Sequence, residues 1–327
     1  MNRSIPFLAL AFWIAALGYS AGARSSDPQS LPELGSGGSN GVVQDALARD
    51  AVCTKCHDEY DGQAMSLYKT RHGVRADEHA PTCQSCHGTS QAHVDNSTRS
   101  APRPPTEVVF GAKSKDNPAS SADTQNEACI GCHESAMRMH WKGSQHEIEG
   151  VACTSCHKVH VGDDPVMNKV TQTDVCLNCH KAKRAELHRP SSHPILEGKT
   201  ACSDCHNPHG SNGPTLLVGA TLNETCYTCH AEKRGPFLWE HEPVREDCSV
   251  CHKPHGSVNE SLLKNRGPWL CQQCHLEQFH PSTAYSGTSL PGASTPSGAQ
   301  QMLGKNCMNC HVQIHGSNHP SGVRKTR

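Results

Sequence analysis

Aromatic residues are scarce in this sequence, at 4% of its 327 residues. Four of the fourteen lie within the first 23 residues, so the remainder of the chain is poorer still. A soluble chain of this length normally builds its core from aromatic and branched aliphatic side chains. The scarcity therefore excludes a conventional large apolar core, and something other than the chain's own side chains must fill the interior.

Long apolar runs are also missing after Ala23, where nothing approaches the roughly 18–20 residues that a membrane-spanning helix requires. Residues 1–23 are typical of a secretory signal peptide, with Arg3 near the start, an apolar stretch over 5–18 and the cleavage pattern Ala21-Gly22-Ala23. An uncleaved anchor is the alternative, but the apolar stretch is short for a membrane span. We expect an exported chain with no transmembrane span of its own.

No cysteine lies outside one pattern, Cys-x-x-Cys-His, which occurs ten times. The twenty cysteines are Cys53, Cys56, Cys83, Cys86, Cys129, Cys132, Cys153, Cys156, Cys176, Cys179, Cys202, Cys205, Cys226, Cys229, Cys248, Cys251, Cys271, Cys274, Cys307 and Cys310. The histidines that end the motifs are His57, His87, His133, His157, His180, His206, His230, His252, His275 and His311. Cysteines at i and i+3 point to one side of a helical turn. This pattern attaches haem c through two thioether bonds, with the histidine as an iron ligand.

A single Cys-x-x-Cys is equally typical of a redox disulfide or of half a zinc site, but ten copies with no cysteine left over favour haem. The sequence therefore predicts ten covalently attached haem c groups, whose porphyrins replace the missing apolar core. The formal net charge of the chain is −1, and two propionates per haem add about twenty acidic groups. An acidic holoprotein argues against nucleic acid as a partner.

The spacing of the motifs predicts the fold class. From Cys129 to Cys271 successive motifs start 22 to 26 residues apart, so a two-haem unit recurs about every 47 residues. Such a period is typical of an elongated array in which each unit contacts its neighbours. With 21 prolines and 27 glycines, we expect a multihaem cytochrome c that is mostly irregular, with short α-helices and little or no β-structure.

The expected domains are the signal peptide at 1–23, a flexible leader at 24–48 and a decahaem cytochrome domain at 49–327. The leader is rich in Ser, Gly and Pro. Within the domain, residues 95–126 and 281–304 form long polar connections, for which we expect surface loops, with contact to a partner as the alternative. Thr173-Asp174 has the residue types of a helix cap.

Fourteen further histidines lie outside the motifs, which is enough to provide each iron with a second axial ligand. A unit consists of a histidine, a motif, a second histidine and a second motif; the motif at Cys53 stands in front of the first unit, and the last unit is stretched. The predicted distal ligands are His72, His93, His146, His160, His193, His209, His241, His255, His280 and His315.

Several alternatives to this ligand set remain open. His319 competes with His315, and a methionine ligand would raise a haem's reduction potential, although the methionines have no regular relation to the motifs. His79, His140 and His188 fall outside the pattern and are expected to contact solvent or propionates. The spacing does not indicate which distal histidine serves which haem.

Two histidines on every iron would favour electron transfer over catalysis, because a catalytic haem needs an open coordination position. We therefore expect an electron carrier and not an enzyme; a multihaem oxidoreductase with one open haem is the weaker alternative. Whether the protein oxidises Fe(II) directly stays open, since an exposed haem of low potential can accept electrons unspecifically.

From about residue 50 onwards the chain resembles the decahaem MtrA-type cytochromes of porin–cytochrome conduits, a family that includes the MtoA and DmsE branches. The resemblance rests mainly on Cys202-Ser-Asp-Cys-His-Asn-Pro-His-Gly-Ser211, Leu238-Trp239-Glu240-His241, Cys251-His-Lys-Pro-His-Gly-Ser-Val258 and His315-Gly-Ser-Asn-His-Pro-Ser-Gly322. The first 130 residues match little beyond the motifs, His72-Gly73 and His93.

The resemblance implies a location and partners. Members of this family insert into an outer-membrane β-barrel porin and carry electrons between periplasmic or inner-membrane cytochromes and an extracellular cytochrome or Fe(II)/Fe(III) species. It implies a periplasmic protein associated with the outer membrane through the porin, in extracellular electron transfer by Fe(II) oxidation or metal reduction; the direction of flow stays open. A freely diffusing periplasmic shuttle to a reductase is the alternative.

Overall fold

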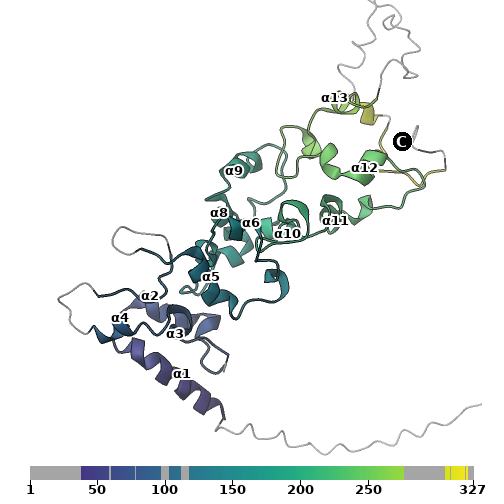
Figure 1. Ribbon diagram of the computed structural model, residues 1–327. Helices are drawn as coiled ribbons and strands as arrows, with labels where there is room; N and C mark the ends of the chain where they lie inside the picture. Colours follow the sequence, from purple (N-terminus) through teal and green to yellow (C-terminus); the bar gives the residue numbers. More distant parts are fainter. Residues whose placement is uncertain are drawn as a thin grey trace, which may run out of the picture.

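The computed structural model describes residues 38–58, 60–77, 79–96, 103–111, 118–275, 306–309, 311–320 and 322. The described chain forms an elongated body in which short helices follow one another in sequence order from α1 at one end to α12 and α13 at the other (Figure 1). Within these residues β-strands are absent and only isolated β-bridges occur. The predicted multihaem fold class, mostly irregular with short helices, is confirmed.

The α-helices are short, apart from α1. They are α1 Gly38–Thr54, α2 Gly62–Met65, α3 Cys83–His87, α4 Gln91–Asp95, α5 Ala122–Ile130, α6 Gln145–Ile148, α7 Cys153–Cys156, α8 Lys169–Leu177, α9 Lys181–Leu187, α10 Cys202–Cys205, α11 Leu222–Tyr227, α12 Glu242–Glu246 and α13 Gly267–Cys271. Single 3-10 turns connect them: η1 Ser66–Lys69, η2 Arg71–Gly73, η3 Ala136–Arg138, η4 Pro165–Met167, η5 Pro214–Leu216, η6 Ala231–Lys233, η7 Cys248–Val250, η8 Glu260–Leu262 and η11 Cys307–Asn309.

The motifs alternate between two local structures. Every second motif begins a helical turn at its first cysteine, as in α3, α7, α10, η7 and η11. The other motifs lie at the end of a helix, with the first cysteine in its last turns, as in α1, α5, α8, α11 and α13. This alternation gives the two-motif period a structural basis, because one unit contains one motif of each kind.

The described residues include only a small apolar core. Leu177, Leu187 and Ile195 form its one buried hydrophobic cluster there, with Cys202 packed against it. The largest side chains that are almost completely buried, Asp50 and Ser257, are polar. The described part of the chain therefore lacks the interior of a conventional domain, as the scarcity of aromatic residues predicts.

The beginning of α1 differs from the expected flexible leader. The helix starts at Gly38, so residues 38–48 of the predicted leader are helical, whereas residues 24–37 lie outside the described part. The physical reason is composition: the Ser/Gly-rich stretch ends at Gly41, and the helix-forming residues of 44–49, such as Ala46 and Leu47, favour a helix that extends back into it.

The cap prediction at Thr173-Asp174 is wrong. Both residues lie inside α8, whose N-cap is Asn168, with its side chain accepting from the Val170 amide. Thr173 is buried there. Threonine has a modest helix propensity, but the packing of a buried threonine against the rest of the protein outweighs it, so Thr173 can lie inside a helix.

Neighbouring units are joined by short backbone bridges. Ser191 and Ser257 exchange both amide–carbonyl hydrogen bonds, at 3.0 and 2.7 Å, and Trp239 and Ser317 do the same at 2.9 Å each. The second bridge returns the C-terminal segment to the side of α12 (Figure 1). None of the described helices is both long enough and apolar enough to cross a membrane.

Candidate haem sites

The motif histidines face other histidines across a nearly constant gap. In nine pairs the ring centroids are 5.9 to 6.3 Å apart. The pairs are His57–His93, His72–His133, His87–His160, His146–His180, His157–His209, His193–His230, His206–His255, His241–His275 and His252–His315. Each pair contains one motif histidine and one of the predicted distal histidines.

The geometry of these pairs fits a haem iron between the rings. Two metal–nitrogen bonds of about 2 Å, plus the two ring radii, give a centroid separation of about 6 Å. The angle between the ring planes ranges from 11° in His57–His93 to 88° in His72–His133, while the separation hardly changes. Direct ring contacts would couple angle and separation, whereas ligands of one metal can rotate freely about their common axis.

The hydrogen bonds of the imidazoles orient them for coordination. In most of the pairs the Nδ1–H of a ring donates to a backbone carbonyl, for example His206 to Thr215 at 2.9 Å and His252 to Ser261 at 2.8 Å. This bond fixes the tautomer and leaves Nε2 as the free lone pair. In His93, whose Nδ1 binds the carbonyl of Pro104 at 2.7 Å, Nε2 is buried without a hydrogen-bond partner. A buried ring nitrogen that has no hydrogen-bond partner within the protein is what we expect of a ligand whose partner is a metal ion.

The pairs follow a simple rule within the regular units. The first histidine of a unit faces the second motif of the same unit, as in His146–His180. The second histidine faces the first motif of the preceding unit, as in His157–His209. Each unit therefore completes a site that belongs to the unit before it. The front motif at Cys53 faces His93, the second histidine of the first unit.

The backbone ties these two kinds of pair together. The first histidine of a unit donates from Nδ1 to the carbonyl of the residue that precedes the second histidine of the next unit. His146 donates to Pro208 at 2.8 Å, His193 to Pro254 at 2.8 Å, and His241 to Ile314 at 3.1 Å. If one unit moved relative to the next, this hydrogen bond would displace two histidines together: the first histidine of one unit and the second histidine of the next.

Consecutive motifs also lie near one another at their cysteines. The first cysteines lie within hydrogen-bonding reach in the pairs Cys53–Cys83, Cys129–Cys153, Cys176–Cys202, Cys226–Cys248 and Cys271–Cys307. At the remaining junctions the second cysteines are close enough for their charges to interact, in the pairs Cys86–Cys132, Cys156–Cys179, Cys205–Cys229 and Cys251–Cys274. Burial, with Asp50 next in importance, raises the pKa of the Cys83 thiol to about 12. All nine junctions between successive motifs therefore bring attachment points close together.

A polar residue three positions before a motif holds the next motif in place. Asn223 Oδ1 accepts from the Cys248 amide at 2.8 Å, and Asn126 Oδ1 accepts from the Cys153 amide at 2.7 Å. Asp50 takes the same position at the front and accepts from the Cys83 amide at 3.1 Å. These residues were not predicted from the sequence, although their constant distance from the first cysteine was a usable signal.

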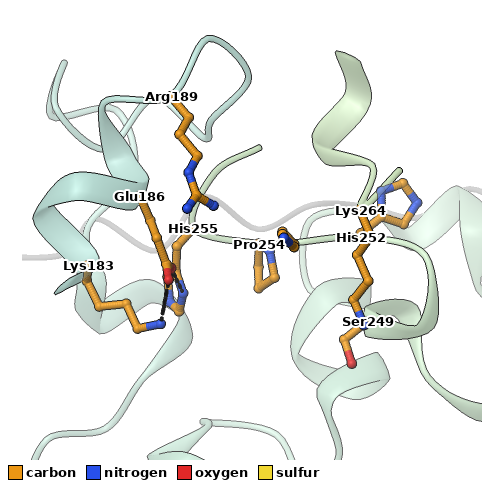
Figure 2. Close-up of a pocket in the computed structure, with 9 residues that line it drawn as sticks. Lys183, Glu186, Arg189, Ser249, His252, Pro254, His255 and Lys264 are labelled. Carbon is orange, nitrogen blue, oxygen red and sulfur yellow. Dashed lines mark hydrogen bonds and ion pairs between the residues drawn. The ribbon is translucent and has the colours of Figure 1, made fainter. Parts of the chain in front are cut away.

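A cationic cavity of about 300 Å³ opens between two of the sites (Figure 2). His255 and His252, which belong to different pairs, line it. Its other lining residues are Lys183, Glu186, Arg189, Ser249, Lys253, Pro254 and Lys264. Four cations beside two candidate haem sites fit the propionates that haem carries, since charge-assisted hydrogen bonds to carboxylates are the strong ones. The charge of this lining is therefore a second feature, beside the imidazole pairs, that suits the binding of haem.

Some predicted site residues are not part of a described pair. His280 and Cys310 lie outside the described residues. His319 does not take the place of His315 opposite His252; its carbonyl accepts from Trp239 Nε1 at 3.0 Å. His79 is exposed, with Nδ1 3.4 Å from Asp77 Oδ1.

The methionines and the zinc alternative find no support in the described part of the chain. Met137, Met139 and Met167 are exposed, and in each of the nine pairs both members are imidazoles. The described residues contain no cluster of three or more His, Cys, Asp or Glu side chains that could hold a metal ion directly. A structural zinc site would need such a cluster.

Comparison with known proteins gives the family. A model of the doubled CXXCH motif matches residues 193–235 and 241–280, which begin at the first histidines of two structural units, and a model of NrfB-like cytochrome c-type proteins matches residues 83–172. The chain is 46% identical over 274 residues to the multiheme cytochrome MtrA of Shewanella baltica (strain OS185), a match that covers 83% of this chain and 79% of that protein. It is thus an electron-transfer protein with covalently attached haem c, and it belongs to the MtrA family of multihaem cytochromes.

Proposed function

We propose that this protein is a ten-haem electron conduit, which carries electrons across the outer membrane inside a β-barrel porin. The twenty motif cysteines hold ten haem c groups, and twenty histidines serve as axial ligands in ten pairs. The observation that carries the proposal is the set of nine facing imidazole pairs at a separation that suits a shared iron.

The tenth pair is inferred from the sequence. His311 is the tenth motif histidine, and His280, which lies outside the described residues, is the tenth predicted distal histidine. The other nine histidines of each kind already belong to described pairs. We assign His280 to the site of His311.

Paired histidines favour electron transfer over catalysis. Haem iron supplies one-electron redox chemistry when bound. An imidazole on each face leaves substrates no coordination position, and the carbonyl-bound Nδ1–H groups keep each ring in its orientation. The chain's role is then to hold, orient and insulate the redox centres.

Continuity along the molecule supports a single path. At all nine motif junctions cysteines of successive motifs lie close enough to affect each other electrostatically, so successive attachment points stay together along the chain. The body is elongated and follows the order of the sequence (Figure 1). Such a shape suits transport from one end to the other better than storage in a compact cluster.

The porin partner is inferred from the family. A chain with this much irregular backbone could not face lipid, because its peptide groups would lose their hydrogen bonds there. The expected location is the periplasm, attached to the outer membrane through the barrel, with periplasmic cytochromes at one end and an extracellular cytochrome or iron species at the other. The signal peptide at 1–23 and one cytochrome domain from residue 49 complete this proposal.

The test has two parts. Mass spectrometry of the mature protein should give ten attached haem groups, and its ferric spectra should be low-spin throughout. Detergent extraction of outer membranes should then co-purify the cytochrome with a barrel protein. A cytochrome found wholly in the periplasmic extract would favour the diffusing shuttle, and several high-spin centres would contradict the paired ligands.

A further inference from the structure

Two of the motif histidines have a carboxylate oxygen as the acceptor of their Nδ1–H. His57 Nδ1 lies 2.6 Å from Asp61 Oδ2, and His157 Nδ1 lies 2.7 Å from Asp164 Oδ2. At His87 the acceptor is instead a peptide carbonyl, that of Val108 at 3.1 Å. The same holds for His206 and His252, described above. An anionic acceptor at two motif histidines, against a neutral carbonyl at three others, is a chemical difference within a repeated scaffold.

Both carboxylates are fixed in place by a second interaction. Asp61 Oδ1 caps α2 by accepting from the Ala64 amide at 3.2 Å, and the hydrogen bond from His57 holds the pKa of Asp61 below its usual value. Asp164 Oδ1 accepts from the amide of Lys158 at 3.2 Å and of Val166 at 3.4 Å. Neither carboxylate is a loose surface group that meets its imidazole by chance.

Two other carboxylates approach haem-site histidines but make weaker contacts. Glu186 Oε2 lies 3.4 Å from His255 Nδ1 and is shared with Lys183 Nζ at 3.1 Å, as Figure 2 shows. Glu232 Oε1 lies 3.8 Å from His230 Nδ1. Hydrogen bonds lose most of their strength at such separations, and Lys183 offsets the charge of Glu186.

We propose that Asp61 and Asp164 act as tuning residues that lower the reduction potential of the two haems bound by His57 and His157. This inference rests on the proposed ligation by those histidines. A carboxylate acceptor increases the electron density that Nε2 can donate to the iron, so it stabilises the ferric state over the ferrous state. Charge-assisted hydrogen bonds are about twice as strong as neutral ones, which separates these sites from the carbonyl-bound ones.

The two effects should differ in size. The His157–Asp164 pair is the more enclosed, with side chains 33% and 18% exposed, against 44% and 37% for His57 and Asp61. Solvent screens the charge of an exposed carboxylate more strongly. Asp164 should therefore lower the reduction potential of its haem by more than Asp61 lowers that of the haem at His57. During stepwise reduction of the whole protein, these two sites should remain oxidised after most of the others have accepted an electron.

The experiment compares matched substitutions in the holoprotein. Asp164→Asn and Asp61→Asn each remove the anionic acceptor. Because the imidazole and the backbone amide bind different oxygens of each carboxylate, replacing one oxygen by NH₂ also removes one of the two acceptor positions. Asp163→Asn and Asp58→Asn remove the same charge from exposed neighbours that do not touch the imidazoles. Asp164→Glu keeps an anionic acceptor and should return the potential towards that of the unaltered protein.

The expected result is a rise in the potential of one haem in ten in each Asn variant. For Asp164→Asn the ferrous-to-ferric ratio at a fixed potential should increase at least tenfold for that haem, which corresponds to about 59 mV for one electron. Low-temperature electron paramagnetic resonance should show one low-spin signal moving to a weaker axial ligand field. The control variants should leave both readouts unchanged.

Two outcomes would overturn the proposal. One is a redox titration of Asp164→Asn that coincides with that of the unaltered protein; the other is an equal shift in Asp163→Asn, which would mean that charge alone acts from a distance. If the His157 site of the unaltered protein were high-spin, the ligation itself would fail, and the spectra distinguish that case. Should an Asn variant lose haem, the Glu variant still tests whether potential follows the position of the negative charge.

Discussion

Replacing Asn223 by alanine should loosen the junction between two successive motifs. The side chain is buried, with 7% of the residue exposed. It accepts from the Cys248 amide at 2.8 Å and donates to the carbonyls of Val244 and Arg245 at 2.9 and 3.0 Å. Alanine leaves these three backbone groups unsatisfied, and each buried group left unpaired costs about 1–3 kcal/mol.

We expect a local loss of about 3 kcal/mol, because the two carbonyls share one amide group and one of them can relax towards solvent. Since each 1.4 kcal/mol is a factor of ten, amide exchange in residues 241–252 should accelerate about a hundredfold. Hydrogen–deuterium exchange of the holoprotein, read by mass spectrometry after digestion, measures this directly. A local readout is needed because covalently bound cofactors make a single global unfolding free energy ill defined.

The control is Asn212→Ala, which alters an exposed asparagine in the same unit as Asn223. Exchange of residues 241–252 should be the same in this variant as in the unaltered protein. If Asn223→Ala also left the exchange unchanged, the inference that this position joins successive motifs would be refuted. Asn223→Asp should be as harmful as alanine, since it keeps the acceptor but loses the donor and buries a charge without the cation that accompanies Asp50.

Three further variants test other parts of the structure. His209→Ala should make the site of His157, in the preceding unit, five-coordinate. One haem in ten should then become high-spin in the ferric spectrum, while the haems attached to the unit that contains His209 stay low-spin. Arg75→Met should leave the buried Asp50 without its ion pair at 2.8 Å and cost about 3–5 kcal/mol, visible as faster proteolysis of the N-terminal end. Gly210→Ala should reduce the yield of fully haem-loaded protein, because Gly210 has φ +105° and a Cβ there would collide with the carbonyl oxygen of His140.

The sequence predicted which histidines matter, but not how they pair. Spacing alone selected ten histidines outside the motifs, and nine of them face a motif histidine in the structure. The pairing escaped prediction because it crosses between units: His209 lies closer in sequence to the Cys202 motif, yet it faces His157. A local pattern cannot reveal a partner that only the stacking of units brings near.

The acceptors of the imidazole N–H groups were unpredictable for a different reason. Most of them are backbone carbonyls, such as those of Thr215 and Ser261, and a carbonyl leaves no signature in the residue type. The carboxylates at Asp61 and Asp164 do have one, but they follow their motif histidines at different spacings of four and seven residues. Without a fixed offset, neither could be distinguished from an ordinary solvated aspartate.

The crossing of histidines between units has a consequence for biogenesis. In the proposed export of the chain, N-terminus first, the motif at Cys202 leaves the inner membrane well before His255, the imidazole that faces the histidine of that motif. Maturation of each such centre must therefore wait for the following segment to be secreted. The same arrangement lets evolution lengthen or shorten the molecule in whole modules, because every inserted module takes one imidazole from its successor and gives one to its predecessor, and only the two ends need exceptions.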